Sequence, residues 1–270
     1  MARIAHRIAC FTADNPGSMT DKGTNQYVLG RDEITVIDVA LPSEQNIDGI
    51  LREAEALGGK KIEKILLTHI HRDHMGGAVA LKKRSGAKLG VFRARAGYLG
   101  GEDFTYADGE TLPYDGGELQ IVHTPGHESG HCCFYEARLG VLFTGDHILG
   151  RGTTVIPAPD GNMVQYLQSL KKLLPLKLNS LLPGHGPKID DPYGKINEYI
   201  AHRLEREKQV LQALRKGAET RAQIVAEIYT DTPQALWRVA ELTVEAHLEK
   251  LLEEGRVRRE GDRYFCAEGS

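Results

Sequence analysis

Three histidines and one aspartate lie within six residues, from His69 to His74. Imidazole nitrogens and carboxylate oxygens are ligands that zinc prefers, and a catalytic zinc site keeps one position open for water. Side chains two residues apart in an extended chain share a face, so His69 and His71 can bind one metal together. A turn after them would direct Asp73 and His74 toward a second metal. The segment therefore predicts a hydrolytic metal centre.

One short segment cannot supply every ligand of two metals, and three further candidates follow it in the chain. His127 is in the sequence Thr-Pro-Gly-His, Asp146 follows an apolar run, and His185 is in Pro-Gly-His-Gly-Pro. A single histidine is more often a structural residue, but these motifs occur in order, each after a predicted strand. We assign His69, His71 and His127 to one metal, and Asp73, His74 and His185 to the other, with Asp146 bridging them. Three histidines next to these motifs could contact the ligands, but packing is the favoured interpretation of each: His123, His131 and His147.

This ligand set points to hydrolysis. A bound metal lowers the pKa of water toward neutrality and so supplies hydroxide as a nucleophile. The metal also polarises a carbonyl or phosphoryl oxygen and stabilises the charge that develops there. Asp73 is the candidate catalytic residue, because it can bind metal and also orient the hydroxide. We expect zinc, with two ions per chain, and the acid that protonates the leaving group is not assigned.

Predicted strands end where the candidate ligands begin. The β-branched run Ile34–Asp38 and the run Lys64–Thr68 are typical of strands, and Val141–Thr144 and Ser180–Pro183 precede two of the later ligands. Further strands are predicted at Lys88–Phe92, Leu119–Val122 and His131–Tyr135, with helices after Ser43, at 77–85 and at 163–174. Strands that first alternate with helices and then follow in series indicate two mixed sheets with helices outside.

The chain after residue 190 has a different pattern. A long helix is predicted from about Lys195 to Lys216, and three short helices follow at 221–229, 232–240 and 242–254. Gly255–Arg258 and Arg263–Cys266 then predict a β-hairpin, which completes a small winged-helix pattern. We therefore predict a catalytic domain over 1–190, a connecting helix over 191–217 and a winged-helix-like domain over 218–270.

The C-terminal segment is acidic, with seven Lys and Arg against eleven Asp and Glu from Ala218 onward. A winged helix that binds phosphates is usually basic, so a packing or dimerising role is at least as well favoured. If the segment does bind RNA, its cationic cluster is on the hairpin: Arg256, Arg258, Arg259 and Arg263. Glutamates nearby in the sequence could neutralise that cluster.

Composition excludes several classes. The chain of 270 residues has a net charge of -3, which gives no general attraction to nucleic acid or to an anionic membrane. It contains no apolar run long enough to span a membrane and no recognisable signal peptide. Four cysteines without a C-x-x-C pattern favour reduced thiols. We expect a cytoplasmic protein with no membrane partner.

The histidine and aspartate motifs resemble those of the metallo-β-lactamase superfamily, over about the first 190 residues. The resemblance implies an α/β fold, the αββα sandwich, and metal-dependent hydrolysis. It also implies that Asp38, at the end of an early strand, contacts the metal ligands rather than the metal.

Other segments resemble the beta-lactamase-like protein 2 family. They are Asn15–Gly17, Gly23–Asn25, Gly145–Val155, Tyr199–Arg203 with Arg206 and Glu207, Tyr229–Pro233 and His247–Gly255. This resemblance implies an endoribonuclease acting on single-stranded RNA, as in mitochondrial animal members. Fungal relatives imply a thioesterase that releases polyketides from a carrier protein. The motif from His202 to Glu207 could equally be structural.

Three functions therefore stay open. The first is a metal-dependent endoribonuclease that cleaves single-stranded RNA. The second is an acyl hydrolase of thioesters, lactones or related small molecules, with weak β-lactamase-type activity as a variant of it. The third is a regulatory or RNA-binding module with a vestigial metal site, against which the complete ligand set argues. The sequence does not determine the oligomeric state.

Overall fold

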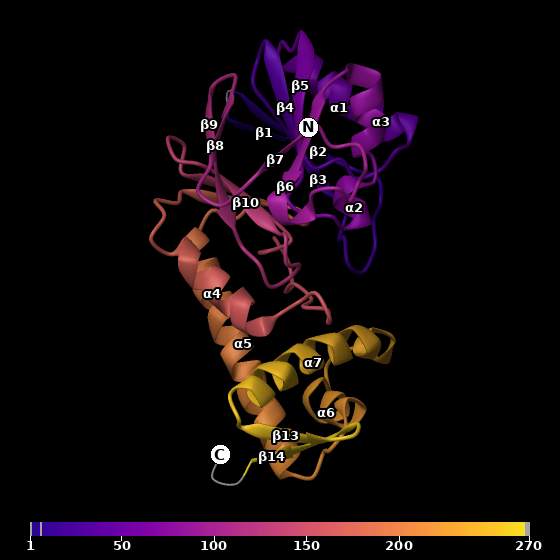
Figure 1. The fold of residues 1–270 in the computed structure, drawn as a ribbon, viewed down its shortest axis with the longest axis vertical. Helices are drawn as coiled ribbons and strands as arrows, with labels where there is room; N and C mark the ends of the chain where they lie inside the picture. Colours follow the sequence, from indigo (N-terminus) through magenta and orange to yellow (C-terminus); the bar gives the residue numbers. More distant parts are fainter. Residues whose placement is uncertain (1, 6, 268–270) are drawn as a thin grey trace. The chain divides into compact units, whose positions relative to one another are not determined.

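Two β-sheets form the centre of the first of two units in the chain (Figure 1). The computed structural model describes residues 2–5 and 7–267. The first unit, the sandwich unit, comprises Met1–Thr124, Gly130–Gly152 and Pro175–Tyr193, and the second, the helical unit, comprises Pro125–Ser129, Thr153–Leu174 and Gly194–Ser270.

The larger sheet has seven strands in sequential order. They are β1 (Ala2–Ala5), β2 (Ile8–Thr12), β3 (Asn25–Leu29), β4 (Glu33–Ile37), β5 (Lys61–Leu66), β6 (Lys88–Phe92) and β7 (Phe104–Tyr106). The strands from β4 to β7 are parallel, whereas β1 to β4 pair antiparallel. Sequence patterning predicts β4, β5 and β6 but misses the first three strands. Strand β3 is wholly buried although it begins with Asn25 and Gln26, residue types that are uncommon in strands.

The smaller sheet has five strands in the order β12-β11-β10-β9-β8. They are β8 (Thr111–Tyr114), β9 (Gly117–His123), β10 (Cys132–Glu136), β11 (Val141–Gly145) and β12 (Ser180–Pro183). Apolar side chains of both sheets meet in one core, with Leu29, Ile37 and Leu66 from the larger sheet. Ile121 and Phe134 join it from the smaller sheet, so the two sheets pack face to face.

Helices cover the outer face of the larger sheet. They are α1 (Glu44–Ala56) and α3 (Ala78–Ser85), with the single turn α2 (Arg72–Met75) and the 3-10 turn η1 (Arg93–Arg95) beside them. The Ser43 side chain accepts a hydrogen bond from the Asn46 amide, which satisfies one otherwise unpaired N–H at the start of α1. Apolar residues of α1 and α3, such as Ile50 and Leu81, pack with Ile65 of β5. Burial of these apolar faces holds the helices on the sheet.

Parallel strand pairs bring the site motifs to the strand ends. Strands β4 and β5 run parallel, and so do β11 and β12. The carboxyl ends of parallel strands meet at one edge of a sheet, where ligands commonly bind. Asp38 and His69 therefore follow one such pair, and Asp146 and His185 follow the other.

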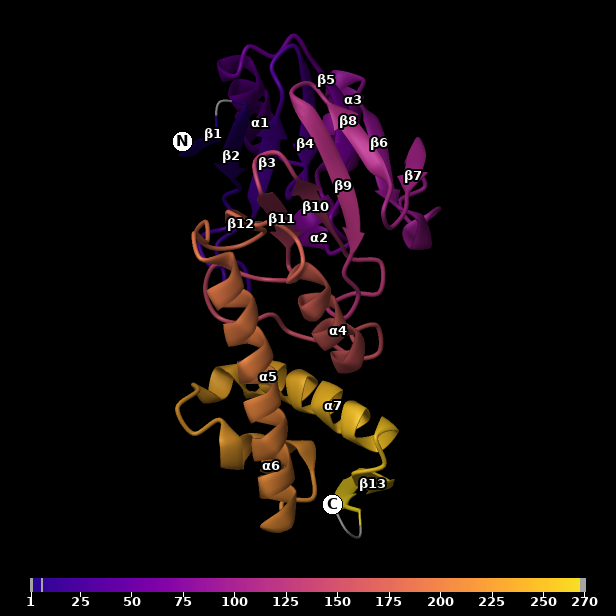
Figure 2. The ribbon, with the colours of Figure 1, turned by 90° about the vertical axis from the view of Figure 1, so that its left-hand side faces the viewer.

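The helical unit contains α4 (Met163–Leu173), most of α5 (Pro192–Arg215), α6 (Arg221–Ile228), the 3-10 turn η2 (Gln234–Leu236), α7 (Trp237–Glu253) and a hairpin of β13 (Val257–Glu260) and β14 (Arg263–Cys266) (Figure 2). Val210 and Leu214 of α5 pack with Val244 and Leu248 of α7 in its core. The two helices predicted at 232–240 and 242–254 are wrong, because α7 runs through both. No glycine or proline interrupts the sequence from 237 to 253, so the helix continues. The predicted domain boundaries at 190 and 217 stay a prediction.

The structure bears on the cysteines and on possible membrane-spanning segments. No disulfide joins the four cysteines, which all lie in the described part of the chain. Among the described residues, no helix combines the length and apolar character needed to cross a membrane.

Candidate metal centre

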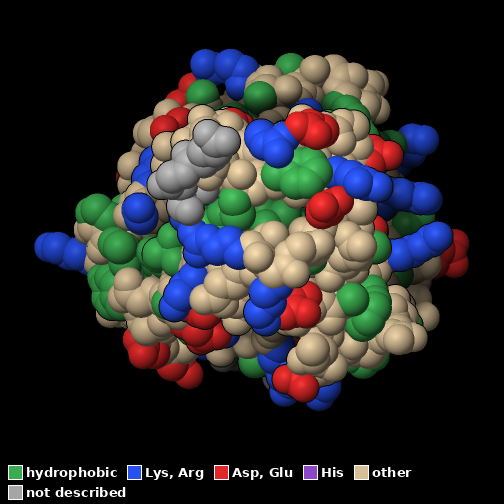
Figure 3. All heavy atoms as spheres, turned by 90° about the horizontal axis from the view of Figure 1, so that it is seen from below, with side chains coloured by type: hydrophobic (Ala, Val, Ile, Leu, Met, Phe, Trp, Pro, Cys, Tyr) green, Lys and Arg blue, Asp and Glu red, His purple; other side chains and the backbone are tan. Residues whose placement is uncertain are grey.

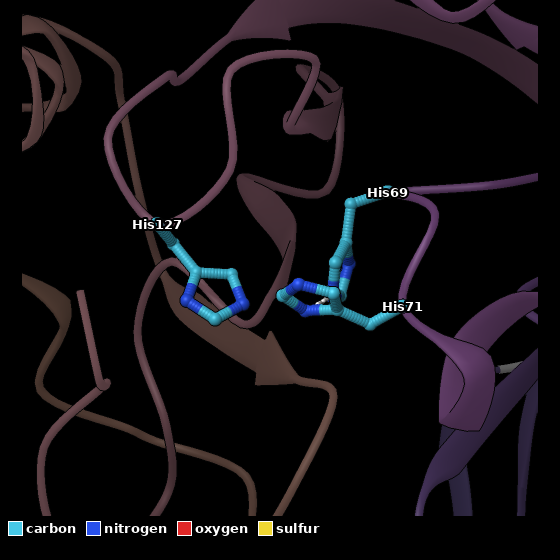
Figure 4. A group of neighbouring side chains, drawn as sticks. All are labelled: His69, His71 and His127. Atoms are coloured by element: carbon cyan, nitrogen blue, oxygen red, sulfur yellow. Dashed lines mark hydrogen bonds between the residues drawn. The ribbon is translucent and has the colours of Figure 1, made fainter. Parts of the chain in front are cut away.

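Three histidines converge from two separate segments of the chain. His69 and His71 follow β5, and His127 lies on a loop after β9, with all three rings pointing toward one another (Figure 4). Each offers one ring nitrogen, and these nitrogens all lie within 4.8 Å of one another. Nε2 of His69 is 3.0 Å from Nδ1 of His71. The structure therefore brings together the three residues that the sequence assigns to one metal.

A second group contains two histidines and two aspartates. Its ligand atoms also lie within 4.8 Å of one another, and its members are Asp73, His74, Asp146 and His185. Oδ1 of Asp146 is 3.2 Å from Nε2 of His74 and 3.3 Å from Nε2 of His185. Oδ2 of Asp73 is 3.2 Å from the same nitrogen of His185. The two Nε2 atoms are themselves only 3.2 Å apart, so the donors converge on one small space.

The two groups are neighbours. The rings of His69 and His74 have centroids 4.2 Å apart. Asp73 and His74 reach the second group because α2 turns the chain directly after His71. The bridging role of Asp146 stays a prediction.

Four of the histidine rings are each held in place by a hydrogen bond at Nδ1. Nδ1 donates from His69 to Oγ1 of Thr68 (3.0 Å), from His74 to Oδ2 of Asp38 (2.8 Å), from His127 to the Val155 carbonyl (2.7 Å) and from His185 to the Gly23 carbonyl (3.2 Å). In the neutral form, a ring that donates through Nδ1 carries its lone pair on Nε2. Such hydrogen bonds set the tautomer and orientation of metal-ligating histidines.

Asp38 is connected by hydrogen bonds to histidines of both groups. Its backbone has a φ of 61°, a left-handed conformation that aspartate tolerates better than most residues. The buried carboxylate accepts hydrogen bonds from the amide and the hydroxyl of Thr68, each at 2.8 Å, as well as from His74. Thr68 in turn accepts from His69. One carboxylate thus contacts a histidine of the second group directly and one of the first group through Thr68, and the prediction that Asp38 contacts ligands rather than the metal stays a prediction.

Some supporting contacts follow from the sequence only weakly or not at all. Nε2 of His131, for which the sequence favours packing over contact with a ligand, accepts a hydrogen bond from the Asp146 amide at 3.2 Å. The side-chain amide of Asn25 donates to the carbonyls of Pro183 and Gly186, both at 2.9 Å, and so holds the loop that carries His185. Backbone carbonyls do most of this work, and every residue type has one. Sequence patterns therefore could not have found the contacts that end on a backbone carbonyl.

The aspartates and histidines of the second group shift one another's pKa values. Burial alone would lower the pKa of His74, but Asp146 and Asp38 raise it well above its usual value. Burial would raise the pKa of Asp146, yet His74 and His185 hold it well below the usual range. Burial also lowers the pKa of His185, but Asp146 and Asp73 raise it to about 9. The carboxylates thus favour positive charge in this space, whether a proton or a metal ion supplies it.

This coupling predicts a pH dependence of metal binding. In the metal-free protein His74 and His185 are protonated at neutral pH, because the pKa of each is raised. A metal must displace these protons, so its apparent affinity should rise with pH until about 9, by up to about tenfold per pH unit for each proton released. Zinc competition titrations at several pH values, with proton release followed in a weakly buffered solution, measure this. Affinity that does not change between neutral and mildly alkaline pH would contradict it.

The residues present fit a divalent metal. Together the two groups present imidazole nitrogens and carboxylate oxygens, and in the second group the Nε2 atoms of His74 and His185 lie 3.2 Å apart beside two carboxylates, an arrangement that a shared cation would stabilise. A family model described as the metallo-beta-lactamase superfamily matches residues 19–185, which include every member of both groups. The chain belongs to the metallo-beta-lactamase superfamily. A second model, the beta-lactamase associated winged helix domain, matches residues 220–265. The predicted fold class is thus confirmed, and the superfamily with these His and Asp groups indicates a divalent metal.

Individual relatives of this superfamily extend over most of the chain. The sequence is 33% identical to the Beta-lactamase-like protein 2 homolog of Drosophila melanogaster over 280 residues, covering 96% of this chain and 92% of the relative. It is 29% identical to an Atrochrysone carboxyl ACP thioesterase of Aspergillus fumigatus, covering 85% of this chain and 76% of that protein. The fold is similar to that of a metallo-beta-lactamase family protein from Thermus thermophilus, with a TM-score of 0.83, 24% identity and coverage of 98% and 100%. The protein is a metal-dependent hydrolase of this superfamily.

Proposed function

We propose that the protein is a binuclear zinc hydrolase that cleaves single-stranded RNA. The observation that carries the metal part is the presence of two adjacent donor groups, linked through the contact between His69 and His74. The donors exceed what one tetrahedral zinc uses. Metal analysis after loading with excess zinc should give about two ions per chain. A firm value of one, with Asp73 and His185 unliganded, would reject the binuclear centre.

The chain's own residues suit a hydrolytic reaction. A bound zinc pair would supply an activated water and polarise the bond under attack. The side chain of Asp73 is 32% exposed against 13% for Asp146, so its carboxylate is the more open to water or substrate. Burial would raise the pKa of Asp73, but its hydrogen bond with His185 and the charge of His74 lower it. Asp73 is therefore ionised at neutral pH and can accept a hydrogen bond or a proton from the attacking water.

The RNA part rests on likeness across the chain. The relative from Drosophila melanogaster matches 96% of this chain, so the likeness is not confined to the sandwich unit. The resemblance to the beta-lactamase-like protein 2 family implies action on single-stranded RNA. This proposal is tested by incubating zinc-loaded protein with a labelled single-stranded RNA and analysing the ends of the products. The matched control is Asp73→Asn, which must lose the cleavage if this site performs it.

An acyl thioester is the second candidate substrate. The thioesterase of Aspergillus fumigatus, matched over 85% of this chain, favours it. Binding of a thioester or lactone also does not require a basic surface, as binding of RNA phosphates does. Turnover of an acyl thioester and a lactone should therefore be measured beside RNA, with the same protein and the same control. If the protein hydrolyses the thioester in an Asp73-dependent reaction but does not cleave RNA, then acyl compounds and not RNA are its substrates.

The hairpin arginines do not form an open cationic cluster. Each has a carboxylate within 4.0 Å: Arg256 has Glu207, Arg258 has Glu260, Arg259 has Glu249 and Arg263 has Glu219. On the face drawn in Figure 3, blue and red side chains are interspersed. Because neighbouring carboxylates offset these charges, the hairpin offers little attraction to phosphate.

We therefore expect replacement of the four hairpin arginines by alanine to leave RNA binding almost unchanged. The measurement is the affinity for a fluorescent single-stranded RNA across a salt series, with a chelator present to prevent cleavage. Each phosphate contact contributes a log–log slope of about -0.7. A variant whose slope becomes flatter by that amount or more would show that the hairpin does bind RNA.

A further inference from the structure

Arg203 is a buried cation in the helical unit. It lies on α5 and is only 1% exposed. Its Nη2 donates a hydrogen bond to the Thr154 carbonyl, and its guanidinium lies over the ring of Tyr166, 5.2 Å from the centroid. Burying a charge costs free energy, which a carbonyl acceptor and an aromatic face offset only in a fixed geometry. Arg203 therefore holds two other segments in place against α5.

The first of these segments orients His127. Thr154 is followed by Val155, whose carbonyl accepts the hydrogen bond from Nδ1 of His127 at 2.7 Å. Because a carbonyl can only accept, Nδ1 carries the proton and Nε2 is the nitrogen that can bind a metal. A shift of the Thr154 carbonyl would move the Val155 carbonyl, since the two peptides are consecutive.

The second segment holds the backbone beside His127. Tyr166 lies in the first turn of α4, and a β-carbon on Gly126 would lie 2.4 Å from its backbone nitrogen. The Gly126 carbonyl accepts a hydrogen bond from the Asn162 amide at 2.8 Å. The backbone of α4 thus packs directly on the residue that precedes His127. Since the guanidinium of Arg203 lies on the Tyr166 ring, Arg203 also helps to hold α4 against Gly126.

We propose that Arg203 is a positioning residue that orients His127 for metal binding, through Thr154 and Val155 on one side and Tyr166 and Gly126 on the other. This inference rests on the proposed role of His127 as a ligand. All the contacts that carry it lie within the helical unit. It assigns part of the motif from His202 to Glu207 a role in the site beyond packing α5.

The chain offers a matched control on the same helix. Arg206 lies three residues after Arg203, with its guanidinium 4.1 Å from the centroid of the Tyr229 ring. It donates to the Ile228 carbonyl at 3.0 Å. The two arginines therefore make the same kinds of contact, but those of Arg206 are with α6 and the residue after it, not with the segments beside His127.

The test compares Arg203→Met, Arg206→Met and His127→Ala in the full chain. Each variant is titrated with Co²⁺, read through its visible absorption, and with Zn²⁺ against a competing chelator, while thermal unfolding reports stability. We expect both arginine variants to unfold at lower temperature. Only Arg203→Met should weaken one of the two metals, by roughly 10- to 100-fold, and alter the Co²⁺ absorption. His127→Ala identifies the same metal by losing it.

Arg203→Lys adds a rescue measurement and a variant that is expected to fold. Lysine keeps the charge and one hydrogen bond but not the planar guanidinium, so metal affinity should lie between those of the wild type and Arg203→Met. Metal affinity in Arg203→Met or Arg203→Lys no weaker than in Arg206→Met would overturn the inference while leaving His127 as a ligand. If His127→Ala binds both metals as tightly as the wild type, the proposed function of His127 fails and the role of Arg203 fails with it.

Discussion

Asp146→Ala is expected to abolish hydrolysis of every substrate while the fold survives. Oδ1 of Asp146 lies 3.2 Å from His74 and 3.3 Å from His185, so the residue is central to the second donor group. Loss of a metal ion removes several kcal/mol of charge stabilisation in the transition state, which corresponds to a fall of about a thousandfold or more in kcat/KM. Turnover on RNA and on an acyl thioester, together with metal content, measures the effect.

The same variant has a second readout in the metal-free protein. Asp146 is a principal cause of the raised pKa of His185, which is about 9. Without that carboxylate the pKa should fall, as burial and the neighbouring His74 both disfavour the imidazolium. An NMR titration of the histidine rings follows this shift. The control is Asp190→Asn, whose carboxylate is 81% exposed and pairs with Lys188. A folded, metal-loaded Asp146→Ala protein with wild-type turnover would show that this aspartate is misassigned.

Gly184→Ala should inactivate the site by adding a single methyl group. A β-carbon at Gly184 would lie 2.6 Å from Cε1 of His74 and 2.9 Å from Oδ1 of Asp146. Both distances are shorter than van der Waals contact, so at least one of these side chains must move. A displacement of about 1 Å in a catalytic group can lower the rate by about a hundredfold. We expect a loss of that order in kcat, with weaker binding of metal by the second group.

The matched control for this prediction is Gly101→Ala. A β-carbon there would lie no closer than 3.9 Å to a neighbouring atom, the Val79 Cγ2, so the methyl group should be tolerated. Thermal unfolding of both variants separates a local effect from a loss of folded protein, since overpacking commonly costs about 1–3 kcal/mol. If Gly184→Ala retains wild-type kcat and metal affinity, the close approach of β12's end to His74 is not required for the chemistry.

Much of the site could be predicted because its ligands are local in the sequence. His69, His71, Asp73 and His74 depend on one strand and one turn, and both follow from short-range patterns. The later members of the two groups, His127, Asp146 and His185, could be picked out from motifs after apolar runs, and their role as ligands stays a prediction. A single histidine or aspartate has many other roles, but several such motifs in this order, each after a predicted strand, are informative even without coordinates.

The sequence by itself determined the donor types, their grouping after strands, the helix that Ser43 caps and the C-terminal hairpin. Only the tertiary structure decided features that depend on distant partners. Strand β3 is buried despite Asn25 and Gln26 because these side chains bond to the Pro183 carbonyl and to Asn46. The hairpin arginines are offset by carboxylates that include Glu207 and Glu219, from other parts of the chain. The hydrogen bond that orients His127 ends on a backbone carbonyl, which every residue has, so only its position in space distinguishes it.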